Sequence, residues 1–230
     1  MVGILGRKIG MTQVFKEDGE IVPVTVIEGG PCCVVQIKAK KTDGYNAIQL
    51  GFEEVKASKL SKPLREKFKK IKAAPRKFIR EFIVADPKDY QLGQHIDVTQ
   101  FSPGDFVDVV GTSRGMGFQG GVKRWHWKIG AKSHGGMSHR EPGSIGASAY
   151  PSRVFKGHHL PGQMGNQRVT IQGLEVVKTD KDNNLLVVKG SVPGHKNCYL
   201  IIKESRKPKK PKLIKKEAES KEKGSPRPKK

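Results

Sequence analysis

The sequence has little cysteine, few aromatic residues and no long apolar run. Its three cysteines, at positions 32, 33 and 198, are too few and too badly spaced for a zinc site or a disulfide framework. No stretch approaches the ~20 consecutive apolar residues of a membrane-spanning helix. The N-terminal residues also lack the apolar core of a secretory signal. These absences lead us to expect a cytoplasmic protein without a membrane partner.

Acidic residues are scarce beside the basic ones. The 230 residues include 44 Lys or Arg and 22 Asp or Glu, so the formal net charge is +22. Such an imbalance destabilises an isolated compact chain by self-repulsion and argues for a polyanionic partner. Hydrophobic residues make up 35%, below the usual share of about 45–50%. Less of this chain is therefore core than in a typical enzyme of its length.

Short runs rich in β-branched residues, bounded by turn residues, recur through much of the chain. The expected strands are 21–27, 32–37, 47–52, 78–84, 95–98, 106–110, 169–178, 185–189 and 199–203. Many short strands at such spacing are typical of a small closed barrel or sandwich. We expect a mainly β fold, with a β-barrel domain formed by residues 1–111 and 169–203.

Residues 56–77 have a helical pattern instead. The apolar residues of this stretch recur at spacings of four, four and three, at Leu60, Leu64, Phe68 and Ile71. Ser61 suits the N-cap and Pro75 ends the helix. Lys and Arg cover the other faces, which fits a solvated basic helix packed on a sheet and direct phosphate contact equally well.

The Gly-rich segment, residues 112–168, has no periodic apolar pattern. It holds 12 glycines, nine Lys or Arg, both tryptophans, five of the seven histidines and a single acid, Glu141. Ordering its backbone costs roughly 1–2 kcal/mol per residue, which so little apolar surface cannot offset. We therefore predict one long loop that is ordered by a polyanion. Cations would neutralise phosphates, glycines would allow close approach, and flat side chains would stack on bases.

The run Lys123–Lys128, KRWHWK, is the most informative part of this segment. If it is extended, one side of the chain carries Lys123, Trp125 and Trp127. The other side then carries Arg124, His126 and Lys128. Such a ribbon could stack on bases with one edge and contact phosphates with the other. The alternative is a tryptophan pair that fills a protein core.

Enzymatic alternatives are weaker. Residues Gly115–Gly120 fit the G-x-G-x-x-G dinucleotide pattern, and Glu141 follows about twenty residues later, yet we expect no helix after Gly120 to hold a pyrophosphate. The histidines have cationic neighbours and no Cys partners, which disfavours a metal site. The serines lack an activating context. We expect no catalytic residue, no cofactor and no small-molecule substrate.

Several motifs in order resemble the bacterial ribosomal protein L3 family of the large ribosomal subunit. They are GILGRKIGMTQVF, VKRW, REPGSIG, RVFKG followed by PGQMGN, and LLVVKGSVPG, within residues 1–203. The resemblance implies a translation-factor-like β-barrel with a small helical insertion and a long loop that enters ribosomal RNA towards the peptidyl-transferase centre. It also implies early RNA binding that nucleates subunit assembly, neighbouring large-subunit proteins as partners, and no catalytic activity.

The basic, aromatic and loop positions together give the expected RNA contacts. These are Arg7, Lys8, Arg114, Lys123, Arg124, Trp125, His126, Trp127, Lys128, Lys132, His134, His139, Arg140, Ser144, Tyr150, Arg153, Lys156, His158, His159 and Arg168. Some bacterial members carry a methylated glutamine two residues before a tip proline. That proline corresponds to Pro151 and the glutamine position to Ala149, so no such modification is expected.

Residues 204–230 form a basic tail. Its composition predicts disorder in the free chain and non-specific phosphate affinity, or simply improved solubility. The competing hypotheses for the whole chain are an enzyme that binds a nucleotide at the Gly-rich segment and a DNA-binding architectural protein. The first requires a helix after Gly120, and the second a groove-reading helix or ribbon.

Overall fold

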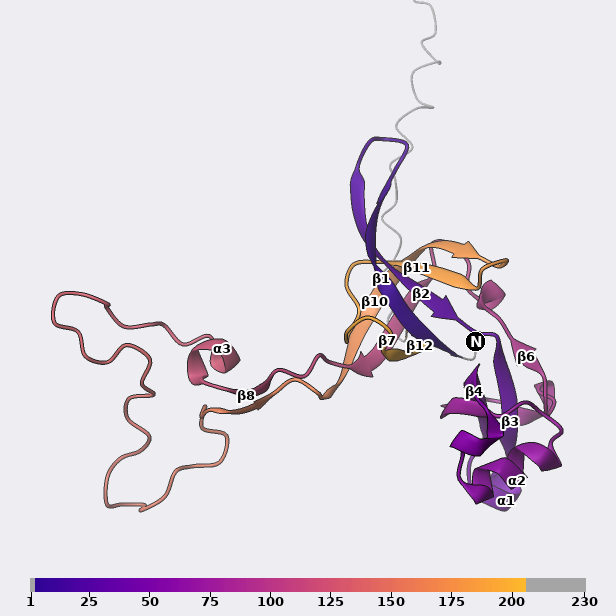
Figure 1. Ribbon diagram of the computed structural model, residues 1–230, viewed down its shortest axis with the longest axis horizontal. Helices are drawn as coiled ribbons and strands as arrows, with labels where there is room; N and C mark the ends of the chain where they lie inside the picture. Colours follow the sequence, from indigo (N-terminus) through magenta and orange to yellow (C-terminus); the bar gives the residue numbers. More distant parts are fainter. Residues whose placement is uncertain (1–2, 206–230) are drawn as a thin grey trace, which may run out of the picture.

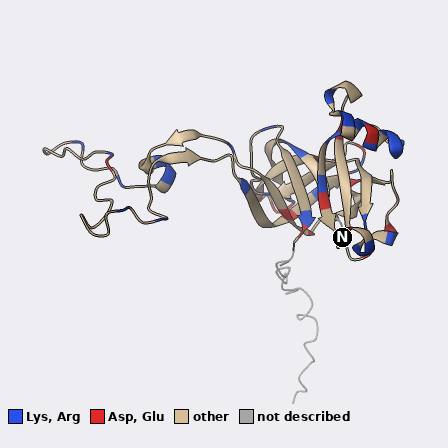
Figure 2. Cartoon of the chain, turned by 90° about the horizontal axis from the view of Figure 1, so that it is seen from below, with Lys and Arg blue, Asp and Glu red and all other residues tan. Residues whose placement is uncertain are grey.

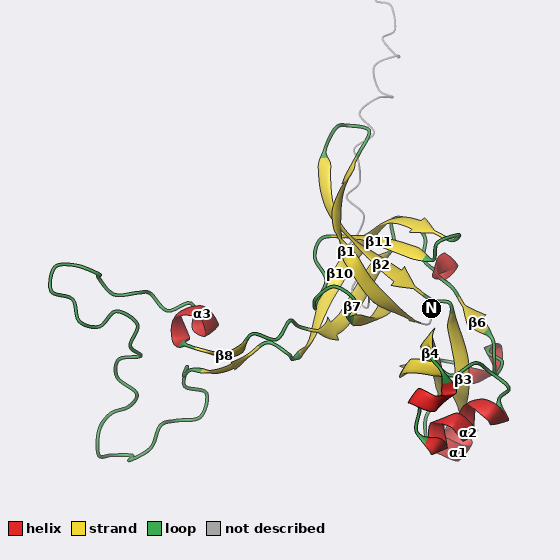
Figure 3. Ribbon diagram, in the orientation of Figure 1, coloured by secondary structure: helices red, strands yellow, loops and turns green. Residues whose placement is uncertain are grey.

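The computed structural model describes residues 3–205 and is mainly β, with few and short helices (Figure 3). The predicted fold class is confirmed at this level. The predictions for the tail concern residues 206–230, which lie outside the described part. Within residues 3–205, no helix is long and apolar enough to cross a membrane.

Six antiparallel strands form a closed ring, in which each strand is hydrogen-bonded to both of its neighbours. In spatial order they are β1 (Ile4–Phe15), β12 (Tyr199–Glu204), β7 (Phe106–Thr112), β10 (Arg168–Asp180), β11 (Leu185–Lys189) and β2 (Ile21–Gly29). A ring leaves few edge hydrogen bonds unpaired, which is how small barrels avoid edge-to-edge association. The sequence pattern set no bounds for β1, the strand that closes the ring between β2 and β12.

The other long strands belong to a second sheet rather than to the ring. Its order is β5 (Arg76–Ile83), β4 (Ala47–Glu54), β3 (Cys32–Lys38) and β6 (His95–Ile96). The expected strand at 95–98 stops at Ile96 and passes into a 3-10 turn, Val98–Gln100. Figure 1 shows the helices α1 (Lys40–Asp43) and α2 (Lys62–Lys70) beside this sheet.

The ring and the second sheet share one hydrophobic core. Buried residues of β1 such as Ile4 and of β12 such as Ile202 belong to the same cluster as Ile48 and Phe82 of the second sheet. A Cβ added at Gly3 would overlap both the Phe82 ring and the Ile202 carbonyl oxygen. The two sheets are thus held together by direct apolar contact, worth roughly 25 cal/mol for each Å² buried.

Helix α2 (Lys62–Lys70) confirms the predicted helical insertion. Phe68 lies on its predicted apolar face and is buried. Ser61 occupies the N-cap position, although its side chain makes no capping hydrogen bond. Five of the nine helical residues are Lys or Arg, and the helices at this end of the molecule carry blue stretches of ribbon in Figure 2.

The Gly-rich segment leaves the ring at the end of β7 and returns at the start of β10, where Thr112 pairs with Arg168. It contains a short antiparallel pair, β8 (Gly117–Gln119) and β9 (Gly162–Met164), and the helix α3 (Gly121–Trp125). In Figure 1 the segment lies to one side of the ring, with α3 beyond β8 and irregular chain beyond α3.

Candidate nucleic-acid interface

The first part of the Gly-rich segment is a narrow two-chain neck. The Ser113 N–H donates to the Gln167 carbonyl at 2.8 Å and the Met116 N–H to the Met164 carbonyl at 2.9 Å, ahead of the β8–β9 pair. Gly165 has φ of 73°, and a Cβ there would overlap the Arg114 carbonyl oxygen. Glycine therefore permits both the left-handed turn and the close approach of the two chains.

A side-chain cluster, the α3 clasp, joins the two chains beyond the neck. Arg124 Nη1 and Trp125 Nε1 both donate to the Leu160 carbonyl oxygen, at 2.7 and 2.9 Å. The Trp125 and His159 rings stack with centroids 4.0 Å apart and an interplanar angle of 7°. The Arg124 guanidinium also lies 4.8 Å from the centre of the Trp125 ring. These contacts fix the start and the end of the irregular chain relative to each other.

The clasp corrects the predicted extended ribbon over Lys123–Lys128. The first part of that run is helical, and the helix ends at His126, whose φ is 60°. Trp127 folds back over Gly121, where an added Cβ would overlap its ring. Partners more than thirty residues later in the chain, Leu160 and His159, decide this conformation. Local alternation could not reveal them.

The structure also corrects the expectation that no helix follows Gly120. Helix α3 begins at Gly121 but has only five residues. The strand before it, β8, pairs antiparallel with β9 and belongs to no βαβ unit. A dinucleotide fold needs a parallel strand pair and a long crossover helix, so the nucleotide hypothesis still fails. Between residues 3 and 205, no group of three or more His, Cys, Asp or Glu could hold a metal.

Beyond the clasp lies the distal part of the Gly-rich segment, residues 128–158, which has no core of its own. Every residue from 128 to 150 is exposed, including Tyr150, whose side chain is 89% exposed. The exposed predicted contacts of this distal part are Lys128, Lys132, His134, His139, Arg140, Ser144, Tyr150, Arg153, Lys156 and His158. Within the described chain, none of its Lys or Arg side chains forms an ion pair with a carboxylate. Their charges remain available to an external anion.

Other predicted contacts lie elsewhere. Arg114 in the neck, Lys123 and His126 around α3, and Arg168 at the start of β10 are all exposed. Arg7 of β1 donates to Glu28 at 2.7 Å and lies 3.6 Å from Glu53. The hydrogen bond and charge of Glu28 raise the pKa of this guanidinium. Arg7 is therefore largely neutralised within the fold.

The structure corrects the prediction that Lys8 contacts RNA. Its side chain is buried, and Nζ donates to the carbonyl oxygens of Val192 and Gly194 at 2.9 and 3.1 Å. An ammonium that satisfies two backbone carbonyls inside the fold cannot reach an external phosphate. Its place beside Arg7 in a basic motif suggested a contact, but alternation along β1 turns the two side chains to opposite faces.

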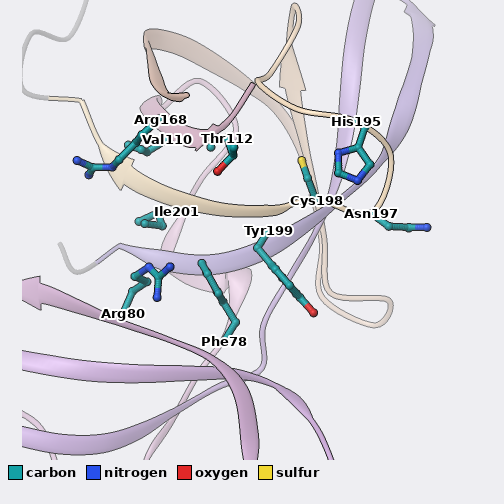
Figure 4. Close-up of a pocket in the computed structure, with 11 residues that line it drawn as sticks. Phe78, Arg80, Val110, Thr112, Arg168, His195, Asn197, Cys198, Tyr199 and Ile201 are labelled. Carbon is teal, nitrogen blue, oxygen red and sulfur yellow. The ribbon is translucent and has the colours of Figure 1, made fainter. Parts of the chain in front are cut away.

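Sequence reasoning missed a groove where the Gly-rich segment joins the ring (Figure 4). This root groove has a volume of about 550 Å³ and lies between β5 of the second sheet and the ends of β7, β10 and β12. Among its lining residues are Phe78, Arg80, Thr112, Arg168, His195 and Tyr199. Only Arg168 was predicted to bind RNA. Because the others come from separate strands and a loop, no local sequence motif could have grouped them.

Comparisons of the sequence with known proteins give consistent matches. A family model described as ribosomal protein L3 matches residues 88–184. The chain is 53% identical over 212 residues to the large ribosomal subunit protein uL3 of Petrotoga mobilis, covering 92% of this chain and 99% of that protein. It is 56% identical over 205 residues to the protein of the same name from Carboxydothermus hydrogenoformans, covering 89% of this chain and 98% of the relative.

Proposed function

Because the chain belongs to the ribosomal protein L3 family, we propose that it is a structural constituent of the large ribosomal subunit and binds the subunit's ribosomal RNA directly. The family is non-enzymatic, so its role is architectural. Its partners are this RNA and neighbouring large-subunit proteins, and its site of action is the cytoplasmic ribosome.

The observation that carries the proposal is the distal part of the Gly-rich segment. It has no core, every residue from 128 to 150 is exposed, and its cations have no carboxylate partner in the described chain. A polyanion supplies what is missing, because phosphates neutralise the cations and packed RNA covers the exposed apolar side chains. Met137 and Phe155 are examples of such side chains.

The fold suggests how the parts share this work. The ring, together with the second sheet, is a rigid base, and the neck and α3 clasp set the direction in which the distal part leaves it. Because the neck and the clasp are already ordered in the free chain, less conformational entropy is lost when the segment binds RNA. We propose that binding occurs early, nucleates subunit assembly, and places residues 144–151 against RNA near the peptidyl-transferase region. The residues Ala147, Ser148 and Ala149 are small and uncharged, which suits close backbone packing on RNA.

Retention in the subunit tests this function. The wild-type chain should remain with the large subunit through a high-salt wash, whereas a chain with Lys128, Lys132 and Arg140 changed to Glu should be lost at lower salt. The matched control changes Lys59, Lys88 and Lys181, three exposed cations outside the segment, to Glu. Equal retention of both variants would exclude the Gly-rich segment as the main RNA contact.

The DNA-binding hypothesis is tested by competition. A protein that reads structured RNA should be displaced from large-subunit RNA by unlabelled RNA of the same sequence and far less by duplex DNA. Within the described chain, the longest helix has nine residues and packs on the second sheet, so the structure offers no long groove-reading helix. Equal displacement by both competitors would favour the DNA hypothesis.

A further inference from the structure

We propose that the root groove is a second RNA-backbone site, separate from the distal part of the Gly-rich segment, in which Arg80 and Arg168 bind phosphate. This inference rests on the proposed function, because it names a further contact with the same RNA. The groove differs from a general basic surface because it is a concave site of about 550 Å³ with apolar lining residues and an arginine that packs on a ring.

Arg80 is held in place by a stack of side chains. Its guanidinium lies 4.4 Å from the centre of the Phe78 ring, and Phe78 stacks on Tyr199 with centroids 4.7 Å apart and planes 12° apart. Lys77 covers Tyr199 at 5.4 Å, and the Tyr199 hydroxyl donates to Glu53. A guanidinium already held over a ring loses little further entropy when its free N–H groups meet a phosphate.

The hydrogen bonds of Arg80 leave most of its donors free. Nη1 donates to the Ile79 carbonyl at 2.7 Å, so the guanidinium is anchored at one corner only. An arginine has five N–H donors in a planar fork that matches phosphate geometry. No ion pair between Arg80 and a carboxylate occurs in residues 3–205.

Arg168 and Arg80 both line the groove, and Figure 4 shows them on the side away from His195 and Asn197. Arg168 is exposed and starts β10, where pairing with Thr112 fixes its backbone at the rim of the ring. No carboxylate lines the groove among the described residues. The groove thus has two cations on one side and polar groups on the other, and its apolar lining includes Ile201 and Val110. This combination suits a phosphate–ribose backbone.

The position of the groove supports the same ligand. It opens where the two chains of the Gly-rich segment leave the ring, so RNA that binds the segment has to pass near it. An acidic protein segment is the other ligand that two arginines could attract. The groove favours RNA because it lies beside the roots of the Gly-rich segment, which is itself the proposed RNA contact.

The test compares three full-length double variants for binding to large-subunit RNA and for hydroxyl-radical footprints. The groove variant is Arg80→Glu with Arg168→Glu, the segment variant is Lys128→Glu with Lys132→Glu, and the control is Lys88→Glu with Lys181→Glu. All six positions are exposed, and each pair changes the net charge equally. We expect the groove variant to lose at least tenfold in affinity and a set of protected nucleotides that the segment variant retains.

A groove variant with the affinity and footprint of the control would overturn the inference. If the wild-type chain itself fails to bind the RNA, the proposed function fails instead. The uncharged pair Arg80→Gln with Arg168→Gln guards against misfolding and should lose the same protections. Arg80→Lys keeps the charge but not the planar stack, and should weaken binding several-fold if the fixed geometry matters.

Discussion

Similar residues in this chain have opposite roles, which are decided by what surrounds each side chain. Lys8 is buried against two carbonyl oxygens, while Lys128 and Lys132 in the Gly-rich segment are exposed without a carboxylate partner among the described residues. The first lysine contributes to folding and the other two are available for binding. The cations behind the net charge of +22 therefore do not all have the same role.

The Lys8→Met substitution should destabilise the fold. Methionine keeps the length of the side chain but leaves the Val192 and Gly194 carbonyls without their donor, which costs about 1–3 kcal/mol. Urea unfolding measures this loss as a lower midpoint at an unchanged slope. Lys16→Met is the control, because Lys16 forms an exposed ion pair with Glu20 and should change stability by less than about 1 kcal/mol. Equal midpoints for the two variants would contradict the structural role of Lys8.

Trp125→Ala should loosen the α3 clasp without unfolding the ring. The change removes both the hydrogen bond to Leu160 and the stack on His159. We expect faster proteolysis within 120–161, an almost unchanged melting temperature, and RNA affinity weaker by about 1–3 kcal/mol because the segment is no longer held ready for binding. Phe15→Ala, which removes an exposed ring outside the Gly-rich segment, serves as the control. A large drop in melting temperature with RNA affinity intact would show that Trp125 is a core residue instead.

At the scale of elements, polar pairs stabilise the second sheet as well as apolar contacts. Glu81 on β5 accepts hydrogen bonds from Lys38 on β3, Gln49 on β4 and Tyr45. The hydrogen bond from Lys38 is the largest cause of the low pKa of Glu81, which is about 2. The single carboxylate thus connects three strands of one sheet face.

The low pKa of Glu81 predicts acid sensitivity. A carboxyl group whose pKa falls on folding stabilises the native state fully above its unfolded pKa of about 4.3, and loses that contribution as the pH falls towards 2. Glu81→Gln should therefore lower stability at pH 6 and reduce the change in stability between pH 6 and pH 3. Chemical denaturation at the two pH values measures this. Identical pH profiles for wild type and variant would mean that Glu81 is not linked to folding.

At the scale of the whole molecule, charge and core are largely separated. Apolar residues gather in the ring and the second sheet, whereas the distal part of the Gly-rich segment carries exposed cations with one acid, Glu141. A basic helical surface at α2 lies on the second sheet, and Figure 2 shows it at the end of the molecule opposite the segment. The apolar core thus lies apart from the exposed cations through which we propose that the chain binds RNA.

Salt dependence should report how many phosphates the distal part contacts. Changing Lys128, Lys132, Arg140, Arg153 and Lys156 to Gln removes five cations that are all exposed. Each phosphate contact contributes about 0.7–0.9 to the slope of log affinity against log salt, so this slope should fall by up to about 4. The melting temperature should stay the same. An unchanged slope would show that the distal part is not a main phosphate ligand.

The tip should affect the RNA behind it and not assembly. Tyr150 is 89% exposed, and Ala149 lies beside it in an uncharged stretch. If residues 144–151 buttress RNA near the peptidyl-transferase region, Tyr150→Ala and Ala149→Arg should assemble normally and alter sensitivity to drugs that bind that region. The control is Lys88→Ala, outside the segment. Wild-type drug sensitivity and peptide-bond rates in both tip variants, with the protein present in the subunit, would refute this role.

The sequence by itself determined the strand-rich class, a helix within residues 56–77 and the coreless character of the Gly-rich segment. Each of these follows from local composition or periodicity, such as the spacing that buries Phe68. Only the tertiary structure decided which strands form the ring, that Lys8 is buried, and that Trp125 stacks on His159. It also brought Arg80 and Arg168 together. These outcomes depend on partners tens of residues apart, and a pattern within one stretch of chain carries no information about which distant stretch will face it.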